Sequence, residues 1–221
     1  MIQLIIFDLD GTLLNTLDDL AAAANAALCT CGFPTRSLEE VRQFVGNGVA
    51  KLLERALPEK EKTAENLARI KNAFFSYYDQ HLWDYTHPYE GIQEVLTALQ
   101  RHHIKLAVAS NKYQAAAERL ITYFFPDISF VAVLGQRENI PTKPNPQIVF
   151  DIFRITGINP KDVLYVGDSA VDMQTAQNAG VQACGVTWGF RSRNELASCQ
   201  PNYLINEPSQ LLEILNQRIR N

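Results

Sequence analysis

The sequence predicts an α/β protein: a Rossmann-like parallel-sheet core with an all-α helical bundle inserted as a cap domain. Three apolar runs, at residues 4–7, 104–109 and 163–166, each end abruptly in small or acidic polar residues, which is typical of buried parallel strands. Helical periodicity separates these runs, and alternating strands and helices form a parallel sheet covered on both faces. From Thr16 to about Tyr85 the pattern is purely helical, which predicts the inserted cap.

The predicted core comprises residues 1–14 and 86–221. Weaker strand candidates lie at residues 130–133, 183–186 and 203–205. Apolar residues at residues 92–99, and approximately at 211–219, follow the spacing of an amphipathic helix. In a sheet of this kind, ligands collect at the carboxyl ends of the strands.

The predicted cap comprises residues 15–85 and contains four helices. These are an Ala-rich helix over 21–27 that stops at Gly32, one opened by a capping box at Ser37–Glu40, one from Val49 to Leu57, and a long one from Glu61 to Trp83. The 221 residues amount to about one and a half domains, and the cap accounts for the extra half.

Composition excludes several classes of protein. Lys and Arg total 20 against 24 Asp and Glu, giving a net charge of −4 and a pI near 5.6, which argues against a general nucleic-acid binder. No apolar stretch is long enough to span a membrane, and the N-terminus lacks the basic flank of a signal peptide. Cys29 and Cys31 would be half of a metal site, but no second Cys or His pair completes it. We expect reduced thiols in a cytoplasmic protein.

Acidic residues stand at the ends of two predicted strands. Asp8 directly follows the run 4–7, and Asp10 lies two residues further on. An Asp-Gly turn would account for Asp10 but not for Asp8. Asp168 ends another strand, and Asp172 follows on the next helical turn. Three carboxylates at one sheet edge repel one another unless a cation lies between them, and oxygen ligands suit Mg²⁺ better than Zn²⁺.

Other polar residues complete a site for phosphoryl transfer. Lys143 would by default be a surface lysine, but the neighbouring prolines fix its backbone and favour a function. Ser110 and Asn111 follow the run 104–109 and can donate hydrogen bonds. A carboxylate can attack phosphorus to form an aspartyl-phosphate, cations and donors stabilise the phosphoryl oxygens, and a second carboxylate serves as acid and then base.

In these motifs the whole chain resembles the haloacid dehalogenase superfamily. The four motifs, in order, are Asp8-Leu9-Asp10-Gly11-Thr12-Leu13, Ser110-Asn111, Lys143, and Gly167-Asp168-Ser169-Ala170-Val171-Asp172. The inserted helices resemble the small helical cap of one branch of that superfamily. Within this branch the sequence is most similar to phosphoglycolate phosphatases, in the stretches 45–48, 87–91 and 167–180.

The resemblance implies roles for the motif residues. Asp8 would be the nucleophile and a Mg²⁺ ligand, and Asp10 would be the acid/base, with its backbone carbonyl also on the metal. Ser110 and Lys143 would bind the transferring phosphoryl group. Asp168 would complete the protein ligands to Mg²⁺.

Further residues would support the site. Asp172 would support the metal site or Lys143 without itself binding the metal. Thr12 and Asn111 would assist in binding substrate. Gly46 and Asn47, in the cap turn 46–48, would contact the leaving group. Two basic residues nearby, Arg42 and Lys51, are further candidates for binding a carboxylate on the leaving group. It is equally consistent with the sequence that both lie on a solvated helix face.

The sequence departs from the family pattern at two positions near the cap. Asn15 stands where many relatives carry Asp, and Glu90 stands where Pro usually precedes the glycine. Asn15 or Thr16 would cap the first cap helix. The cap is expected to close over the core on hinges near Leu14-Asn15 and Tyr85-Pro88.

We therefore expect a cytoplasmic, Mg²⁺-dependent phosphatase acting on small phosphorylated metabolites similar to phosphoglycolate, as a monomer or homodimer, with no nucleic-acid or membrane partner. Two alternatives stay open. One is a phosphoglucomutase-like phosphotransferase, although Asp18-Asp19-Leu20 stands where such enzymes usually carry a cap histidine. The other is a catalytically silent relative that binds a phosphorylated ligand or a partner protein.

Overall fold

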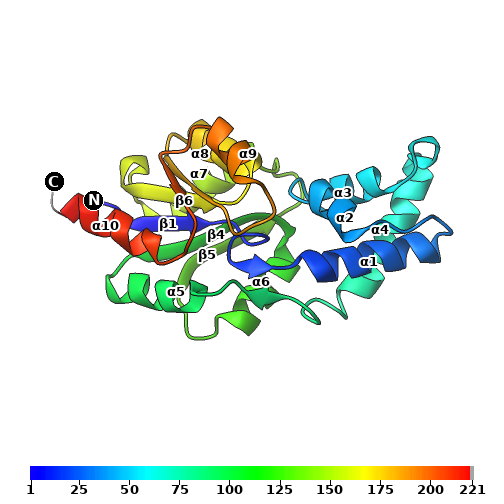
Figure 1. The fold of residues 1–221 in the computed structure, drawn as a ribbon, viewed down its shortest axis with the longest axis horizontal. Helices are drawn as coiled ribbons and strands as arrows, with labels where there is room; N and C mark the ends of the chain where they lie inside the picture. Colours follow the sequence, from blue (N-terminus) through cyan, green and yellow to red (C-terminus); the bar gives the residue numbers. More distant parts are fainter. Residues whose placement is uncertain (220–221) are drawn as a thin grey trace.

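A computed structural model describes residues 1–219 and shows an α/β core with a helical cap at one end (Figure 1). The strands are β1 (Leu4–Phe7), β2 (Leu14–Asn15), β3 (His87–Pro88), β4 (Lys105–Tyr113), β5 (Phe130–Gln136), β6 (Val163–Gly167), β7 (Gln182–Val186) and β8 (Tyr203–Ile205). The helices are α1 (Leu17–Thr30), α2 (Leu38–Phe44), α3 (Val49–Ala56), η1 (Glu59–Glu61), α4 (Ala64–Tyr78), α5 (Ile92–Arg101), α6 (Gln114–Phe124), α7 (Gln147–Thr156), η2 (Pro160–Asp162), α8 (Ala170–Ala179), α9 (Arg193–Ser198) and α10 (Gln210–Ile219).

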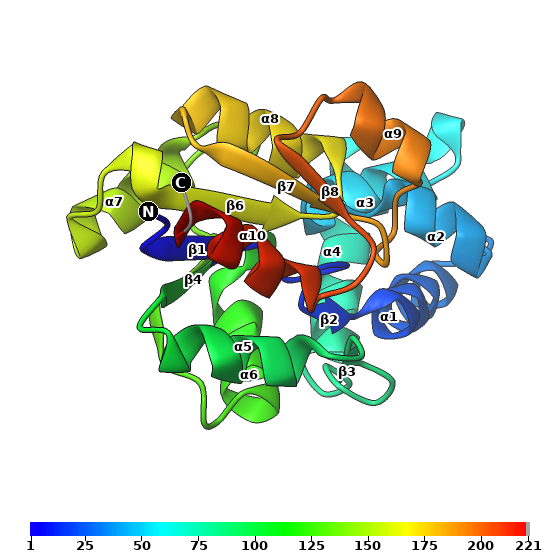
Figure 2. The same ribbon diagram turned by 60° about the vertical axis from the view of Figure 1, so that its left-hand side comes forward.

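Six parallel strands form the core sheet in the order β5-β4-β1-β6-β7-β8. Side chains alternate along the central strand β1: Leu4 and Ile6 pack with α7 and α8, whereas Ile5 and Phe7 pack with α5, α6 and α10. Figure 2 shows the first pair of helices on one side of the sheet and α5 and α6 on the other. Burial on both faces explains why β1 is apolar at every position. The predicted fold class is confirmed.

All six predicted strands are present, but two continue well beyond their predicted ends: the strand expected over 130–133 runs to Gln136, and the other bears on the site. The strand expected over 104–109 continues to Tyr113, so Ser110 and Asn111 belong to β4 itself. The sequence rule that a polar residue ends a buried strand fails here because this part of β4 lies at the carboxyl-terminal edge of the sheet, where polar side chains have partners.

The four expected cap helices are present, with different lengths. The capping box at Ser37 is formed as expected, with reciprocal hydrogen bonds to Glu40. The helix expected from Glu61 to Trp83 is shorter: α4 begins at Ala64, because the Thr63 side chain caps it, and ends at Tyr78. The 3-10 turn η1 precedes it. Among the described residues, no helix is both long and apolar enough to cross a membrane.

The chain passes between core and cap at two adjacent places. Residues of β2 and β3 pair antiparallel, Leu14 with Pro88 and Asn15 with His87, so the two expected hinges lie side by side. The carboxylate of Asp19 in α1 accepts hydrogen bonds from the backbone amides of Tyr85 and Thr86 and from the Thr86 hydroxyl. This carboxylate holds the two crossings together. The exact domain limits, 14/15 and 85/86, stay a prediction.

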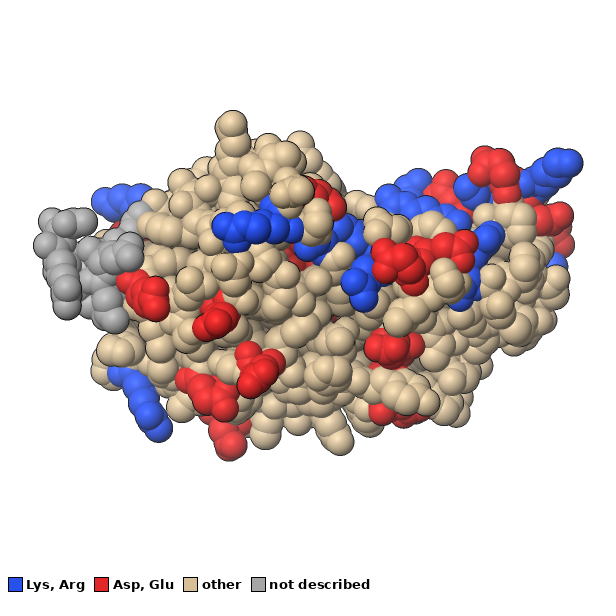
Figure 3. Space-filling model, in the orientation of Figure 1, with Lys and Arg blue, Asp and Glu red and all other residues tan. Residues whose placement is uncertain are grey.

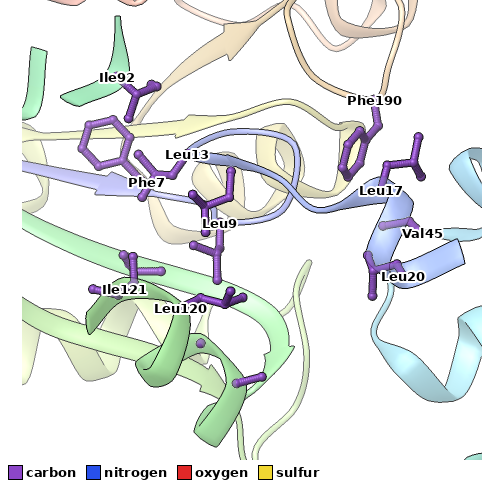
Figure 4. Close-up of a cluster of buried hydrophobic side chains, with 14 of the residues drawn as sticks. Phe7, Leu9, Leu13, Leu17, Leu20, Val45, Ile92, Leu120, Ile121 and Phe190 are labelled. Carbon is purple, nitrogen blue, oxygen red and sulfur yellow. The ribbon is translucent and has the colours of Figure 1, made fainter. Parts of the chain in front are cut away.

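Apolar packing continues from the core into the cap. In Figure 4, Leu9 and Leu13 lie between Phe7 of the core and Leu17 and Leu20 of α1. All five side chains are buried. The cap is therefore seated on the core by buried apolar contact as well as by the two hinge segments.

Candidate active site

The site lies where the strand order reverses. From β1 the chain crosses to β4 and β5 on one side of β1 and later returns to β6 on its other side. A crevice forms at the carboxyl ends of the strands at such a switch point. Asp8 follows β1, Ser110 lies in the last part of β4, and Asp168 follows β6. The structure thus brings together the residues that the sequence places at three strand ends.

Three buried carboxylates converge at this edge. Asp8, Asp168 and Asp172 each place one oxygen within 4.8 Å of the others. Burial, with the charge of Asp172 next in size, raises the pKa of Asp8 from 3.8 to about 7, and the same causes raise the pKa of Asp168 well above its usual range. A cluster that offers only carboxylate oxygens, with pKa values raised by burial and by neighbouring carboxylates, fits a hard divalent cation such as Mg²⁺.

Lys143 supplies positive charge beside the carboxylates. Its Nζ lies 3.0 Å from Asp8 Oδ1 and 2.7 Å from Asp172 Oδ1, and donates to the Ala109 carbonyl at 2.9 Å. Burial alone would lower the pKa of Lys143, but Asp172 and Asp8 outweigh it and raise that pKa well above its usual value. The amine therefore stays cationic. Asn111 fixes its backbone, accepting from Lys143 N and donating to Lys143 O.

Asp172 serves Lys143 and the start of α8 together. Its Oδ1 accepts from Lys143, while Oδ2 accepts from the Ser169 amide and hydroxyl in a second capping box. The side chain is fully buried. The capping interaction at the start of α8 thus fixes the Asp172 side chain next to Asp8.

Asp10 faces a different set of groups. Its Oδ1 accepts from the Thr16 hydroxyl at 2.7 Å and lies 2.9 Å from Lys112 Nζ. Lys112 is itself buried, 5.1 Å from the centre of the Tyr78 ring of the cap helix α4. The charge of Asp10 outweighs burial and raises the pKa of Lys112. The two acids of the first motif therefore occupy separate environments.

A loop after β7 closes the site from the other side. The amide of Phe190 donates to Asp168 Oδ2 at 2.7 Å, and Trp188 Nε1 donates to the carbonyl of Thr12 at 3.0 Å. A Cβ on Gly189 would come within 2.3 Å of the Gly11 carbonyl oxygen and 2.5 Å of Asp168 Oδ2, so only glycine fits there. Arg191, which directly follows Phe190, donates hydrogen bonds to the cap.

Several of these groups line one cavity between core and cap, whereas Lys143 and Asp172 are buried outside its wall. Its polar side consists of Asp8, Asp10, Ser110, Asn111, Lys112, Asp168, Ser169 and Arg191, and its apolar side of Leu20, Val45, Val49, Leu52 and Phe190, with Gly46 and Gly48 in the wall. The enclosed volume is about 40 Å³, enough for about three water molecules. Basic side chains gather where core and cap meet on the face shown in Figure 3.

Comparison with known proteins agrees with this geometry. The model of the haloacid dehalogenase-like hydrolases matches residues 5–186. The chain belongs to this family. It is 33% identical over 219 residues to a phosphoglycolate phosphatase of Mannheimia succiniciproducens, covering 96% of this chain and 98% of that protein. It is 34% identical to one from Vibrio vulnificus, with 97% and 96% covered.

Solved structures show the same likeness. A predicted phosphoglycolate phosphatase from Haemophilus somnus superposes with a TM-score of 0.90 at 33% identity, covering 97% of this chain and 98% of that one. The likeness extends over core and cap together, so this haloacid dehalogenase-like hydrolase shares the whole architecture of these relatives.

Not every residue expected in the site lies in the cavity wall of this hydrolase. Asn47 turns away, and its amide oxygen accepts from Arg55. Lys51 is exposed and pairs with Glu54, and Arg42 lies 3.5 Å from Glu39. Thr12 is buried outside the wall, 3.5 Å from Asp168 through its hydroxyl.

Of the two departures from the family pattern, Asn15 lies at the hinge in β2, and Glu90 lies beyond it in the core. The Asn15 side chain accepts weakly from the Leu17 amide at 3.3 Å. The Thr16 hydroxyl makes no capping bond, because it donates to Asp10 instead. Glu90 lies outside the cavity, in a separate groove with Trp188 and Pro208.

Sequence reasoning missed two cations and one donor of this site. They are Lys112, Arg191 and the amide of Phe190. Lys112 had a signal, since it directly follows Ser110-Asn111 at a strand end. Arg191 and Phe190 had none, because they act on backbone groups and on a residue from another strand.

Proposed function

We propose that this chain is a Mg²⁺-dependent phosphatase that hydrolyses small phosphate monoesters, phosphoglycolate among them, through an aspartyl-phosphate on Asp8. The observation that carries the proposal is the placement of Asp8 3.0 Å from the cationic Lys143, with Asp10 held by separate donors in the same cavity. The similarity to phosphoglycolate phosphatases supports the substrate class.

In the first half-reaction, Asp8 attacks phosphorus as the bond to the ester oxygen breaks. Asp10 gives a proton to the departing alkoxide, so that an alcohol leaves. Thr16 and Lys112 fix the orientation of the Asp10 carboxylate. In the second half-reaction, Asp10 takes a proton from water as that water attacks phosphorus. This releases inorganic phosphate and restores both carboxyl groups.

Two side chains would hold the phosphoryl oxygens. The Lys143 ammonium is fixed by Asp172 and the Ala109 carbonyl. The Ser110 oxygen accepts from the Lys112 amide at 3.3 Å, which leaves its own O–H to donate to a phosphoryl oxygen. These donors are in place before the charge develops, so little reorganisation is needed.

Asp8, Asp168 and the backbone carbonyl of Asp10 would hold the Mg²⁺ ion, with Asp172 behind them. When bound, this ion neutralises the charges of the carboxylates and the phosphoryl oxygens. The Phe190 amide fixes one oxygen of Asp168, and this hydrogen bond fixes the orientation of the Asp168 carboxylate.

The cap would exclude water from the first half-reaction. The cavity is small, and Leu20, Val45 and Leu52 are on its apolar side. Substrate would enter while the cap is raised on the β2–β3 hinge. Closure then removes bulk water from around the attacking carboxylate.

A phosphate-release screen tests the proposal, over phosphoglycolate, sugar phosphates, nucleotides and pyrophosphate with and without Mg²⁺. We expect Mg²⁺-dependent release from small monoesters, and loss of at least about 1000-fold in kcat for Asp8→Asn, because the nucleophile is gone. Asp18→Asn, an exposed acid of α1, is the matched control and should keep full activity.

Two results would contradict the proposal. Near-normal kcat in Asp8→Asn would show that the nucleophile is another group. No release from any monoester by the wild-type chain would favour the silent relative. Free inorganic phosphate also separates hydrolysis from a phosphotransferase, which would leave the phosphoryl group on the sugar.

A further inference from the structure

Arg191 is a cation of the cavity wall that the proposed mechanism leaves unused. It lies in the loop after β7, directly after Phe190, whose amide binds Asp168. Its side chain is mostly buried, with 12% exposed. Of the residues that line the cavity, Arg191 and Lys112 are the basic ones.

The cap holds this guanidinium in place. Nη1 donates to the carbonyl of Arg42 at 2.7 Å, and Nη2 donates to those of Val45 at 2.6 Å and Gln43 at 3.4 Å. These carbonyls belong to the last turn and C-cap of α2, where a helix leaves carbonyl groups without internal partners. Asn111 Nδ2 donates to the next one, Gly46 O. Core donors thus bind four carbonyls of the cap stretch 42–46.

The charge of Arg191 is less compensated than that of the other site cations. Lys143 contacts Asp8 and Asp172, and Lys112 contacts Asp10, all within about 3 Å. The carboxylate paired with Arg191 is Glu195, at 3.6 Å from Nε, and that side chain is 42% exposed to solvent, which screens it. A guanidinium has five N–H donors; the three carbonyl bonds leave one on Nη1 and the one on Nε, which faces Glu195.

The opposite wall offers an anion no charged side chain. The cap contributes the side chains of Leu20, Val45, Val49 and Leu52, all apolar, and the backbone of Gly46 and Gly48. The basic cap residues that the sequence suggested for this purpose, Arg42 and Lys51, pair with glutamates instead. A leaving group that carries its own negative charge therefore has Arg191 as its less compensated cationic partner within the cavity, because Lys112 is paired with Asp10.

We propose that Arg191 determines substrate specificity: the cap stretch 42–46 fixes its guanidinium on the cavity wall, where it binds a carboxylate on the leaving group of the phosphate ester. This inference rests on the proposed phosphatase function and names the substrate class of that site. Because the guanidinium is already oriented before substrate arrives, little side-chain entropy is lost on binding.

The test compares two esters of the same skeleton. Phosphoglycolate carries the carboxylate, and monoethyl phosphate has a methyl group in its place. The measured quantity is the ratio of kcat/KM for the first ester to that for the second. We expect Arg191→Ala to lower this ratio about 10- to 100-fold, the loss of one or two charge-assisted hydrogen bonds. Arg191→Lys keeps the charge without the planar fork and should lower it less.

Arg193→Ala is the matched control. Arg193 lies two residues further along the chain, at the start of α9, and donates to Asn206 of the core, so the Arg193→Ala ratio should equal the wild-type one. A ratio within about twofold of wild type in Arg191→Ala would overturn the proposal. This holds even if both kcat/KM values fall, because an arginine with a purely structural role would lower the two values equally. Should Arg191→Ala fail to fold, the same criterion applies to Arg191→Gln, which removes the charge and keeps a donor for the cap carbonyls.

A binding measurement separates failure of this inference from failure of the phosphatase function. Calorimetric titration of the Asp8→Asn protein with each ester, with and without Arg191→Ala, requires no turnover. Tighter binding of phosphoglycolate that depends on Arg191, together with no hydrolysis of either ester by the wild-type chain, would retain the specificity residue and reject the hydrolase. Equal binding of the two esters in the presence of Arg191 would reject the specificity residue alone.

Discussion

Magnesium should stabilise this protein more at alkaline than at acidic pH, because its carboxylates are buried together. Burial, with the charge of Asp172 next, raises the pKa of Asp8 from 3.8 to about 7. The folded chain therefore binds this proton more tightly than the unfolded chain does. Without a cation, stability falls as pH rises from the unfolded pKa to the folded one, and the whole loss is present above about pH 7.

The size of the effect follows from this shift. A rise of 3.2 units, at about 1.36 kcal/mol per unit, corresponds to a loss of about 4 kcal/mol from Asp8 above pH 7. Because part of this loss has already occurred at about pH 5, the free energy of unfolding should fall by about 3 kcal/mol between pH 5 and 8. Asp168, whose pKa is also raised, acts in the same direction.

Urea unfolding followed by tryptophan fluorescence measures this quantity, in EDTA and in excess Mg²⁺, at about pH 5 and about pH 8. Mg²⁺ competes with protons for the carboxylates, so it should restore most of the loss at the higher pH and add little at the lower. Asp8→Asn should flatten the pH dependence in EDTA. A Mg²⁺ stabilisation of equal size at both pH values would refute this reasoning.

Two substitutions should act through contacts that geometry fixes. Gly189→Ala places a Cβ against Asp168 and should reduce kcat by at least about 100-fold, whereas Gly185→Ala, whose nearest neighbour is the flexible end of Leu204 at 3.0 Å, should keep most activity; similar rates in both would contradict the crowding argument. Asp19→Ala leaves three donors at the hinge without their acceptor and should cost about 3 kcal/mol in urea unfolding. Its exposed neighbour Asp18→Ala should change stability by less than about 0.5 kcal/mol, and equal effects of the two would exclude a hinge role.

The sheet and the acidic edge were predictable because both depend on local patterns. A run such as 4–7 is apolar at every position because both of its faces are covered, and the polar residue that ends it marks the open edge of the sheet. Asp8 and Asp168 could therefore be placed together from the sequence. Their separation from Asp10 could not, because it depends on Thr16 and Lys112 meeting that side chain in space.

Arg191 shows the limit of sequence reasoning. Its partners are backbone carbonyls of residues 42–45, and a carbonyl has no sequence signal because every residue carries one. The sequence offered Arg42 as a basic residue at this place, and the structure uses the Arg42 carbonyl instead. The end of α4 is similar, since the residues after Tyr78 keep a helical pattern while the chain turns toward the hinge.

The position of β1 in the sheet has a consequence for how the chain folds during synthesis. Leu4 pairs with Lys105 on one side and with Val163 on the other. The central strand thus emerges first, yet both of its neighbours are made much later. The cap helices α1 to α4 contact one another within residues 17–78, so the cap can form before β4 and β6 are made. The apolar segment 4–7 therefore stays unpaired, next to cap helices that have already formed, until β4 and β6 are made. During this time it is exposed to aggregation and would benefit from a chaperone.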